Sequence, residues 1–218
     1  MQPDYNLLKL KFYSTVIADI LKAIDGGSFG GAFILSFCCI DYLGKPLSIL
    51  AAKNKNDKND YKYFIKNYMG KVNNRYIDLV DHFYAIRCSL VHTYGESDAS
   101  RNSNIEPQFL FGDFLNYHLT FDNNNKKINI SLSDFVSELI SALYLFFTNL
   151  SLLTNEWSLQ LYYPQDLKGL TGRNLIKLGD QINYGTIHPF LEILNTSDDI
   201  SQICVDIKNK VEEQINKH

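Results

Sequence analysis

FVSELISALYLFFTNLSLL, residues 135–153, is the stretch that decides the fold. Apolar side chains fill most of it, and its polar residues, such as Glu138 and Asn149, keep to a stripe with helical spacing. This pattern predicts a long helix buried in a protein core rather than a span across a bilayer. Ser133 and Asp134 directly precede the stretch and are suited to cap the N-terminus of the helix.

Five further helices are expected, because apolar residues recur at helical spacing between residues that cap or end helices. They cover residues 6–24, ending at Gly26 and Gly27; 28–43, capped by Ser28 and closed by Gly44 and Pro46; 61–69, ended by Gly70; 73–94, capped by Asn73 or Asn74; and 196–215, started by Thr196 or Ser197 with Asp198 and Asp199. The helix over 28–43 is apolar nearly all round, which places it centrally. The charged, Asn-rich residues 53–60 between these helices predict a loop.

A small β element is expected between the helices. Residues 95–108 are polar and irregular and predict an exposed loop. Alternation over 117–121, the turn DNNNKK and renewed alternation through Ile128 and Ile130 then predict a β-hairpin over about 117–131. Residues 156–195 give no clear pattern, and short strands or turns are expected there.

The fold class that follows is mainly α, in one domain over residues 1–218. Its core helices cover about 6–95 and 133–154, the hairpin about 117–131, and a C-terminal extension with one further helix about 156–218. The chain is 45% hydrophobic, enough to bury a sizeable core. A net charge of -3 excludes a polybasic protein whose whole surface is committed to nucleic acid, so any such contact has to be local.

The cysteines and the N-terminal sequence suggest an intracellular protein without a metal. Cys38, Cys39, Cys88 and Cys204 form no CxxC pair and have no zinc-ligand spacing, so we expect reduced, mostly buried thiols and no metal or cofactor. The start MQPDYNLLKLKFY has no signal-peptide pattern. We expect a cytoplasmic protein with no membrane contact.

The stretch FYAIRCSLVHTYG, residues 83–95, carries the candidate chemistry. On a helix, Arg87 and His92 lie about 140° apart, at the two edges of one face, and Tyr94 lies about 20° from Arg87. Tyr84 and Cys88 fall between Arg87 and His92 and would line that face. A planar guanidinium suits a phosphodiester, and an imidazole can move a proton near neutral pH. One imidazole cannot easily take and give a proton at once, whereas two copies of the chain could.

The string RCSLVH, from Arg87 to His92, resembles the R-x4-6-H motif of HEPN domains, and its continuation to Tyr94 resembles the R-x4-H-x-Y form of HEPN toxins. The resemblance implies a helical bundle that forms a homodimer with both motifs facing each other. It implies metal-independent cleavage of RNA, with Arg87 and His92 as catalytic residues, in a toxin or antiviral defence effector. It also implies that Tyr94 is open to modification by a nucleotidyltransferase-type antitoxin partner.

A second interpretation is a catalytically inactive HEPN-like module that binds RNA, a nucleotide or a protein partner. Active members of the family usually carry a polar residue directly after the arginine, and this chain has Cys88 there. A third interpretation is a helical scaffold that only mediates assembly.

Individual residues also have structural explanations. His92 suits a helix C-terminus on charge grounds alone, and Tyr94 can simply pack. Asp41, at the end of an apolar helix, is expected either to pair with Arg87 and orient its guanidinium or to face solvent. Residues 53–75 mix Lys with aromatic residues, which can bind RNA, but a solvated segment with inward-packed aromatics is favoured.

Overall fold

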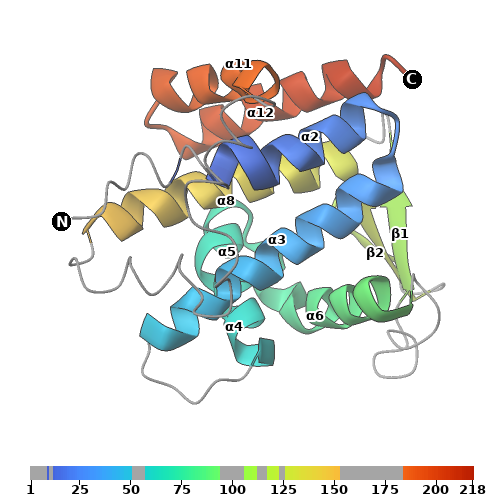
Figure 1. Ribbon diagram of the computed structural model, residues 1–218. Helices are drawn as coiled ribbons and strands as arrows, with labels where there is room; N and C mark the ends of the chain where they lie inside the picture. The colour runs from blue at the N-terminus through green and yellow to red at the C-terminus, as the bar shows by residue number, and fades with distance from the viewer. Residues whose placement is uncertain are drawn as a thin grey trace, which may run out of the picture.

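The computed structural model describes residue 9 and residues 12–50, 57–93, 106–111, 117–122, 126–152 and 184–218 (Figure 1). It is mainly helical with a small three-stranded sheet, which confirms the predicted mainly α class. In Figure 1, α11 (Tyr184–Thr196) and α12 (Ile200–Ile215) lie at the top, and α4 (Asp57–Phe64) and α6 (Arg75–Thr93) lie at the bottom. Between them lie α2 (Ala18–Asp25), α3 (Phe29–Leu50), α5 (Gly70–Val72) and α8 (Leu132–Leu152).

Aromatic rings join the three helices that matter for the site. Phe37 of α3 packs against Phe135 of α8 with ring centroids 5.0 Å apart, and Phe83 of α6 lies 5.8 Å from each of them. All three rings are fully buried. Burial of large aromatic surfaces dominates core energetics, so this cluster fixes α3 and α6 against α8.

The first described helix ends as predicted. A π-helical turn, η1 (Tyr13–Ile17), leads into α2, which stops at Gly26. Gly27 follows with φ +71°, a left-handed conformation that favours glycine. The backbone then enters α3, where the carbonyl of Ser28 accepts from the N–H of Ala32 at 2.9 Å, as expected for the predicted start.

The predicted end of the next helix is wrong. Helix α3 continues through Gly44 and Pro46 to Leu50 instead of closing near Leu43. A proline inside a helix removes one hydrogen bond, but tertiary packing supplies most of the stability of a helix in a protein. Helix α3 packs along α4, which offsets that loss.

Two boundaries in the following segment also differ from prediction. Helix α4 begins at Asp57, inside the predicted loop, because Asp60 and Tyr61 are buried and need a regular backbone against α3. The chain then forms a π-helical stretch, η2 (Ile65–Met69), and passes through Gly70 into α5 instead of ending there. A Cβ atom on Gly70 would lie 2.8 Å from Cγ1 of Ile77, so glycine permits the close approach of α5 to α6. Asn73 starts α6 as predicted, since its Oδ1 accepts from the N–H of Arg75 at 3.2 Å.

The predicted hairpin is confirmed, and the structure adds a third strand. Strand β2 (Phe121–Asp122) pairs antiparallel with β3 (Lys127–Ser131), and β1 (Glu106–Leu110) pairs parallel with β3, giving the order β1-β3-β2. The loop prediction is therefore wrong for residues 106–108. Pro107 has no N–H to donate, but β1 is an outer strand, where proline is tolerated.

Helix α8 is confirmed, but its predicted cap is wrong. The helix begins at Leu132, and Ser131 Oγ accepts from the N–H of Asp134 at 3.5 Å. The two residues predicted as caps contact α12 instead. Ser133 Oγ donates to Glu212 at 3.1 Å, and Asp134 pairs with Lys208 at 2.5 Å, which ties α8 to α12.

The C-terminal part is more helical than predicted. Residues 184–195, expected to hold strands or turns, belong to α11, which contains Pro189; residues 156–183 lie outside the described part. The last helix is confirmed as α12, with Ile203, Ile207 and Val211 buried on one face. Its cap is Asp199, which accepts from the N–H of Ser201 at 2.9 Å, rather than Thr196 or Ser197.

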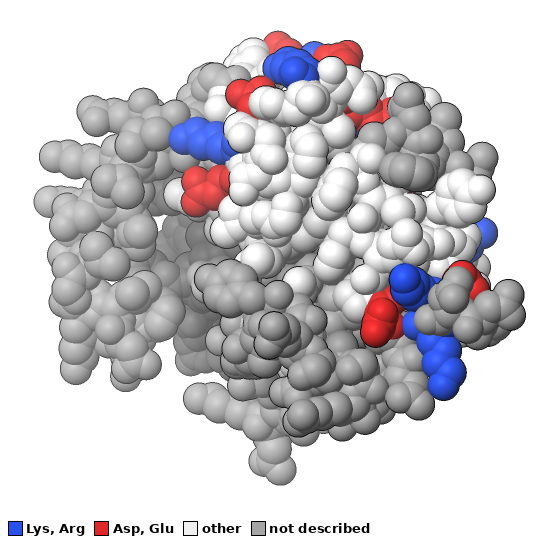
Figure 2. Space-filling model, turned by 90° about the vertical axis from the view of Figure 1, so that its right-hand side faces the viewer, with Lys and Arg blue, Asp and Glu red and all other residues white. Residues whose placement is uncertain are grey.

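All four cysteines are free, but only Cys39 is buried, and the exposed Cys38 contradicts the expectation of mostly buried thiols. Among the described helices, none is both long enough and apolar enough to cross a membrane. Figure 2 shows the side of the molecule that lies to the right in Figure 1. The described surface there is largely uncharged, with Lys and Arg near the edges beside Asp and Glu. The described part of this face therefore shows no broad basic track for a nucleic acid.

Candidate functional site

The site lies between α6 and α3 and is built around Arg87. Its Nη2 donates to Oδ2 of Asp41 at 2.7 Å, and the two side chains are only 15% and 16% exposed. The ion pair that the sequence suggested is therefore confirmed. Because a guanidinium held by a carboxylate loses rotational freedom, Asp41 orients Arg87, whose place in a functional site stays a prediction.

The rest of the guanidinium is weakly engaged. Nη1 lies 3.8 Å from Sγ of Cys88, a poor acceptor, and Nε is buried with no hydrogen-bond partner in the described part of the chain. Burial lowers the pKa of Arg87, but the hydrogen bonds to Asp41 and Cys88 outweigh it and raise the pKa overall. Arg87 therefore stays charged, with donors that a better acceptor could use.

Two tyrosines flank this arginine. Tyr61 of α4 is fully buried and donates to the carbonyl of Phe83 at 3.5 Å, and its ring meets that of Tyr84 edge-on, with centroids 5.8 Å apart. Burial raises the pKa of Tyr61 well above its usual value and, with a hydrogen bond to Cys88, raises that of Tyr84. Both phenols are therefore neutral at physiological pH and can donate hydrogen bonds but carry no charge.

The local charge is close to balanced. Asp41 cancels the charge of Arg87, and Lys62 of α4 pairs with the exposed Asp81 of α6. Lys58 lies over the ring of Tyr84, with Nζ 5.7 Å from the centroid. An anion would therefore be held here by the geometry of Arg87 and by Lys58 rather than by a strong positive field.

The structure brings together four of the six predicted site residues: Arg87, Cys88, Tyr84 and Asp41. His92 belongs to the last turn of α6, but its side chain lies outside the described residues. Tyr94 also lies outside them. Their roles in catalysis and modification stay predictions.

The basic and aromatic segment is packed as the favoured interpretation expected. Tyr61, Phe64 and Tyr68 are buried in the core, and only Tyr63 is exposed among the aromatic residues of α4 and η2. The Lys residues of this segment therefore do not alternate with exposed stacking surfaces, and it does not resemble a platform for unpaired bases.

A second polar cluster was missed from the sequence. Oε2 of Glu138 accepts from the hydroxyl of Tyr76 at 2.6 Å and lies 2.8 Å from Nε2 of His118, and Oε1 accepts from Nδ2 of Asn73 at 2.8 Å. Glu138, Tyr76 and His118 are all buried. These residues come from α8, α6 and the hairpin and are far apart in the sequence. No local spacing could reveal them, although a Glu on an apolar helix indicates a need for partners.

The hydrogen bonds also define the state of His118. The N–H of Ser131 donates to Nδ1 at 3.1 Å, so Nδ1 is unprotonated and the proton lies on Nε2, facing Glu138. The imidazole is thus neutral in this arrangement. Glu138 accepts three hydrogen bonds, which fix the position of its carboxylate.

Among the described residues, no group of three or more His, Cys, Asp or Glu side chains could hold a metal ion. The chain matches no family model, no curated protein and no solved structure.

Proposed function

We propose that this protein is a HEPN-like, metal-independent endoribonuclease that cleaves RNA at a site shared by two copies of the chain. The fixed position of Arg87 carries the proposal. Asp41 holds its Nη2 at 2.7 Å, and His92 follows five residues later on the same helix. This arrangement supports the resemblance of residues 87–92 to the HEPN motif, because an oriented guanidinium can bind two phosphate oxygens in one geometry.

Arg87 binds the scissile phosphate in this proposal. Its Nη1 contacts only the weak acceptor Cys88, so a phosphate oxygen can replace the sulfur at little cost. Tyr84, whose pKa is raised by burial and by Cys88, donates a hydrogen bond as a neutral phenol. Asp41 is a positioning residue that keeps the guanidinium pointed at the phosphate.

His92 supplies the proton transfer. In one copy it takes the proton of the ribose 2′-hydroxyl, whose oxygen attacks the phosphorus. The partner's His92 gives a proton to the 5′-oxygen that leaves. Two imidazoles are needed because one cannot be base and acid in the same step, which is the reason for a homodimer.

The proposed biological role is that of a toxin or antiviral defence effector acting on RNA in the cytoplasm. Tyr94 would then be the residue that a nucleotidyltransferase-type antitoxin partner modifies. Modification of a phenol two residues after His92 adds charge and bulk beside the scissile phosphate, which would block RNA binding.

The decisive experiment is RNA cleavage in the presence of EDTA by the full chain and by His92→Ala. We expect clean cleavage by the wild type and a loss of at least about a hundredfold in the variant, with the far-UV circular dichroism unchanged. His188→Ala is the matched control, because His188 is an exposed helical histidine on α11 that pairs with Glu192 and belongs to no proposed site. Equal cleavage by His92→Ala and His188→Ala would refute the assignment.

A second candidate function is binding without catalysis, to RNA, a nucleotide or a protein partner. Two observations favour it: Cys88 takes the place of the usual polar residue, and Asp41 cancels the charge of Arg87. Binding of RNA in EDTA without any cleavage, lost in Arg87→Ala, would support this function. Cleavage that depends on His92 would exclude it.

A further inference from the structure

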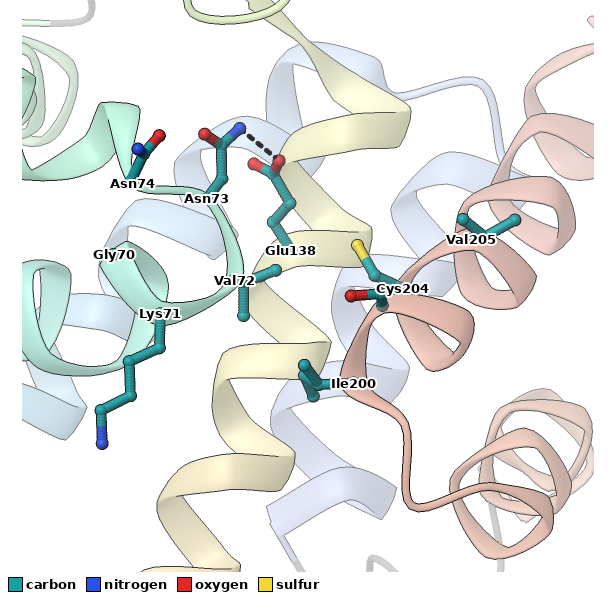
Figure 3. Close-up of a pocket in the computed structure, with 10 residues that line it drawn as sticks. Gly70, Lys71, Val72, Asn73, Asn74, Glu138, Ile200, Cys204 and Val205 are labelled. Carbon is teal, nitrogen blue, oxygen red and sulfur yellow. Dashed lines mark hydrogen bonds between the residues drawn. The ribbon is translucent and has the colours of Figure 1, made fainter.

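A pocket of about 500 Å³ lies where the α5–α6 turn, α8 and the first turn of α12 meet (Figure 3). Its lining is part apolar, from Val72, Ile200 and Val205, and part polar, from Asn74, Ser201 and Glu138. It is separate from Arg87 and its neighbours, none of which lines it. A concave site with apolar walls and a few polar groups is the usual form of a small-molecule site.

The buried carboxylate of Glu138 gives this pocket its chemical character. Three donors, from Asn73, Tyr76 and His118, hold it in place. A carboxylate has about four acceptor positions, so one stays available after these three. Glu138 lines the pocket, so the pocket gives a ligand access to this carboxylate.

Glu138 makes no ion pair with Lys or Arg among the described residues. Its nearest basic partner is His118, whose Nε2 lies 2.8 Å from Oε2, and the hydrogen bond from Ser131 to Nδ1 leaves this imidazole neutral. Lys71 also lines the pocket, but its Nζ lies 5.9 Å from the ring centroid of Tyr68, and Figure 3 shows the side chain running away from Glu138. Lys208 of α12 is bound by Asp134 at 2.5 Å, and Glu138 only adds to the attraction that raises the pKa of Lys208.

A buried charge with no cation in direct contact is costly, and proteins normally pair it. We propose that this pocket binds the ammonium group of a small aliphatic amine, with Glu138 as its counter-ion. An ammonium needs one charged acceptor and can use neutral acceptors, and the side chains of Ser201 and Asn74 line the same pocket. A divalent metal would find a single carboxylate here, since the described residues hold no cluster of metal ligands. The apolar walls suit the methylene chain of an amine.

The ligand test uses the full chain and compares 1,4-diaminobutane with 1,4-butanediol at constant ionic strength by isothermal titration calorimetry. The two probes have similar length, and only the diamine carries charge. We expect saturable one-to-one binding of the diamine and at least about tenfold weaker binding of the diol, as expected for one charged hydrogen bond. Equal binding of both probes, or no saturation by the diamine, would overturn the proposal. So would displacement of the diamine by potassium ions at the same concentration, which would indicate an inorganic cation site.

Two variants locate the binding. Ser201→Phe fills the pocket from an exposed position, and Glu138→Gln removes the charge at similar size. We expect each to weaken diamine binding at least about tenfold. Asn209→Phe, at an exposed position two turns further along α12, is the matched control and keeps wild-type affinity. If near-UV circular dichroism shows that Glu138→Gln does not fold, Ser201→Phe decides alone. Wild-type affinity in Ser201→Phe would refute binding in this pocket.

Discussion

At the scale of single residues, the ion pair between Arg87 and Asp41 is the best test of how the candidate site is held. Asp41→Ala leaves a largely buried guanidinium without its carboxylate. We expect a loss of about 1–3 kcal/mol in the free energy of unfolding, measured by urea denaturation, because an unpaired, partly buried charge loses its compensation. Asp41→Asn keeps a hydrogen-bond acceptor for Arg87, so its free energy of unfolding should fall less than that of Asp41→Ala.

The control for this variant is Asp81→Ala. Asp81 lies on the same helix as Arg87 and pairs with Lys62 of α4, but its side chain is 71% exposed. Exposed ion pairs contribute little, so we expect a change within about 0.5 kcal/mol. If Asp41→Ala were as mild as Asp81→Ala, Asp41 would not hold Arg87 in solution, and its positioning role would be lost.

Tyr76 and His118 test the buried polar cluster. Tyr76→Phe removes one donor to Glu138 at constant shape and should lower the free energy of unfolding by about 1–2 kcal/mol. The described hydrogen bonds also predict that the ring proton of His118 lies on Nε2, which the ¹⁵N chemical shifts of the imidazole report directly. A proton found on Nδ1 would contradict the hydrogen bond from Ser131 and the tautomer assigned to His118.

At the scale of elements, two neighbouring aspartates precede α12, and the hydrogen bonds select Asp199 as its cap. Asp199 accepts from the N–H of Ser201, so Asp199→Ala should cost about 1 kcal/mol in unfolding free energy, measured by thermal or urea denaturation. Asp198→Ala removes the same charge at the preceding residue. It should lower the free energy of unfolding by less than about 0.5 kcal/mol, because Asp198 makes no cap hydrogen bond in the described structure. A larger loss for Asp198→Ala than for Asp199→Ala would contradict this cap.

Periodicity predicted the long helices, and local signals misled where packing opposed them. Helix α8 and the buried face of α12 follow from apolar spacing alone. Pro46 indicated the end of a helix, yet it lies inside α3, as Pro189 lies inside α11, because contacts with neighbouring helices offset one lost hydrogen bond. Strand β1 was missed because its partner β3 is distant in the sequence, and a parallel pair leaves no local turn signal.

The candidate site was predictable only where it is local. Arg87, Cys88 and Tyr84 share one turn of one helix, and the pairing of Arg87 with Asp41 could be suggested because an acid at an apolar helix end needs a partner. The cluster around Glu138 joins three elements whose contact depends on the tertiary fold. Its residues could therefore not be grouped from one sequence.

At the scale of the whole molecule, the proposed functions use opposite charge on two separate parts of the helical bundle. Arg87 offers donors to an anion between α3 and α6, while Glu138 offers an acceptor to a cation between α5, α8 and α12. The chain as a whole carries a net charge of only -3, so neither ligand is attracted by a strong overall field. Affinity at both sites therefore depends on preorganised side chains, and moderate salt should weaken it less than it weakens binding to a polybasic surface.

The buried tyrosines make the stability of the whole domain sensitive to alkaline pH. Burial raises the pKa values of Tyr13, Tyr61 and Tyr76, whereas a tyrosine in the unfolded chain ionises at about pH 10. Their contribution to the free energy of unfolding is fully present below about pH 10. It falls by about 1.4 kcal/mol per tyrosine and pH unit as the pH rises toward the pKa values of the folded protein. We expect cooperative unfolding in this range, followed by far-UV circular dichroism together with tyrosinate absorbance. Tyr13→Phe should move the midpoint to higher pH and Tyr63→Phe, at an exposed position, should not; an identical midpoint in both variants would show that burial of Tyr13 does not limit alkaline stability.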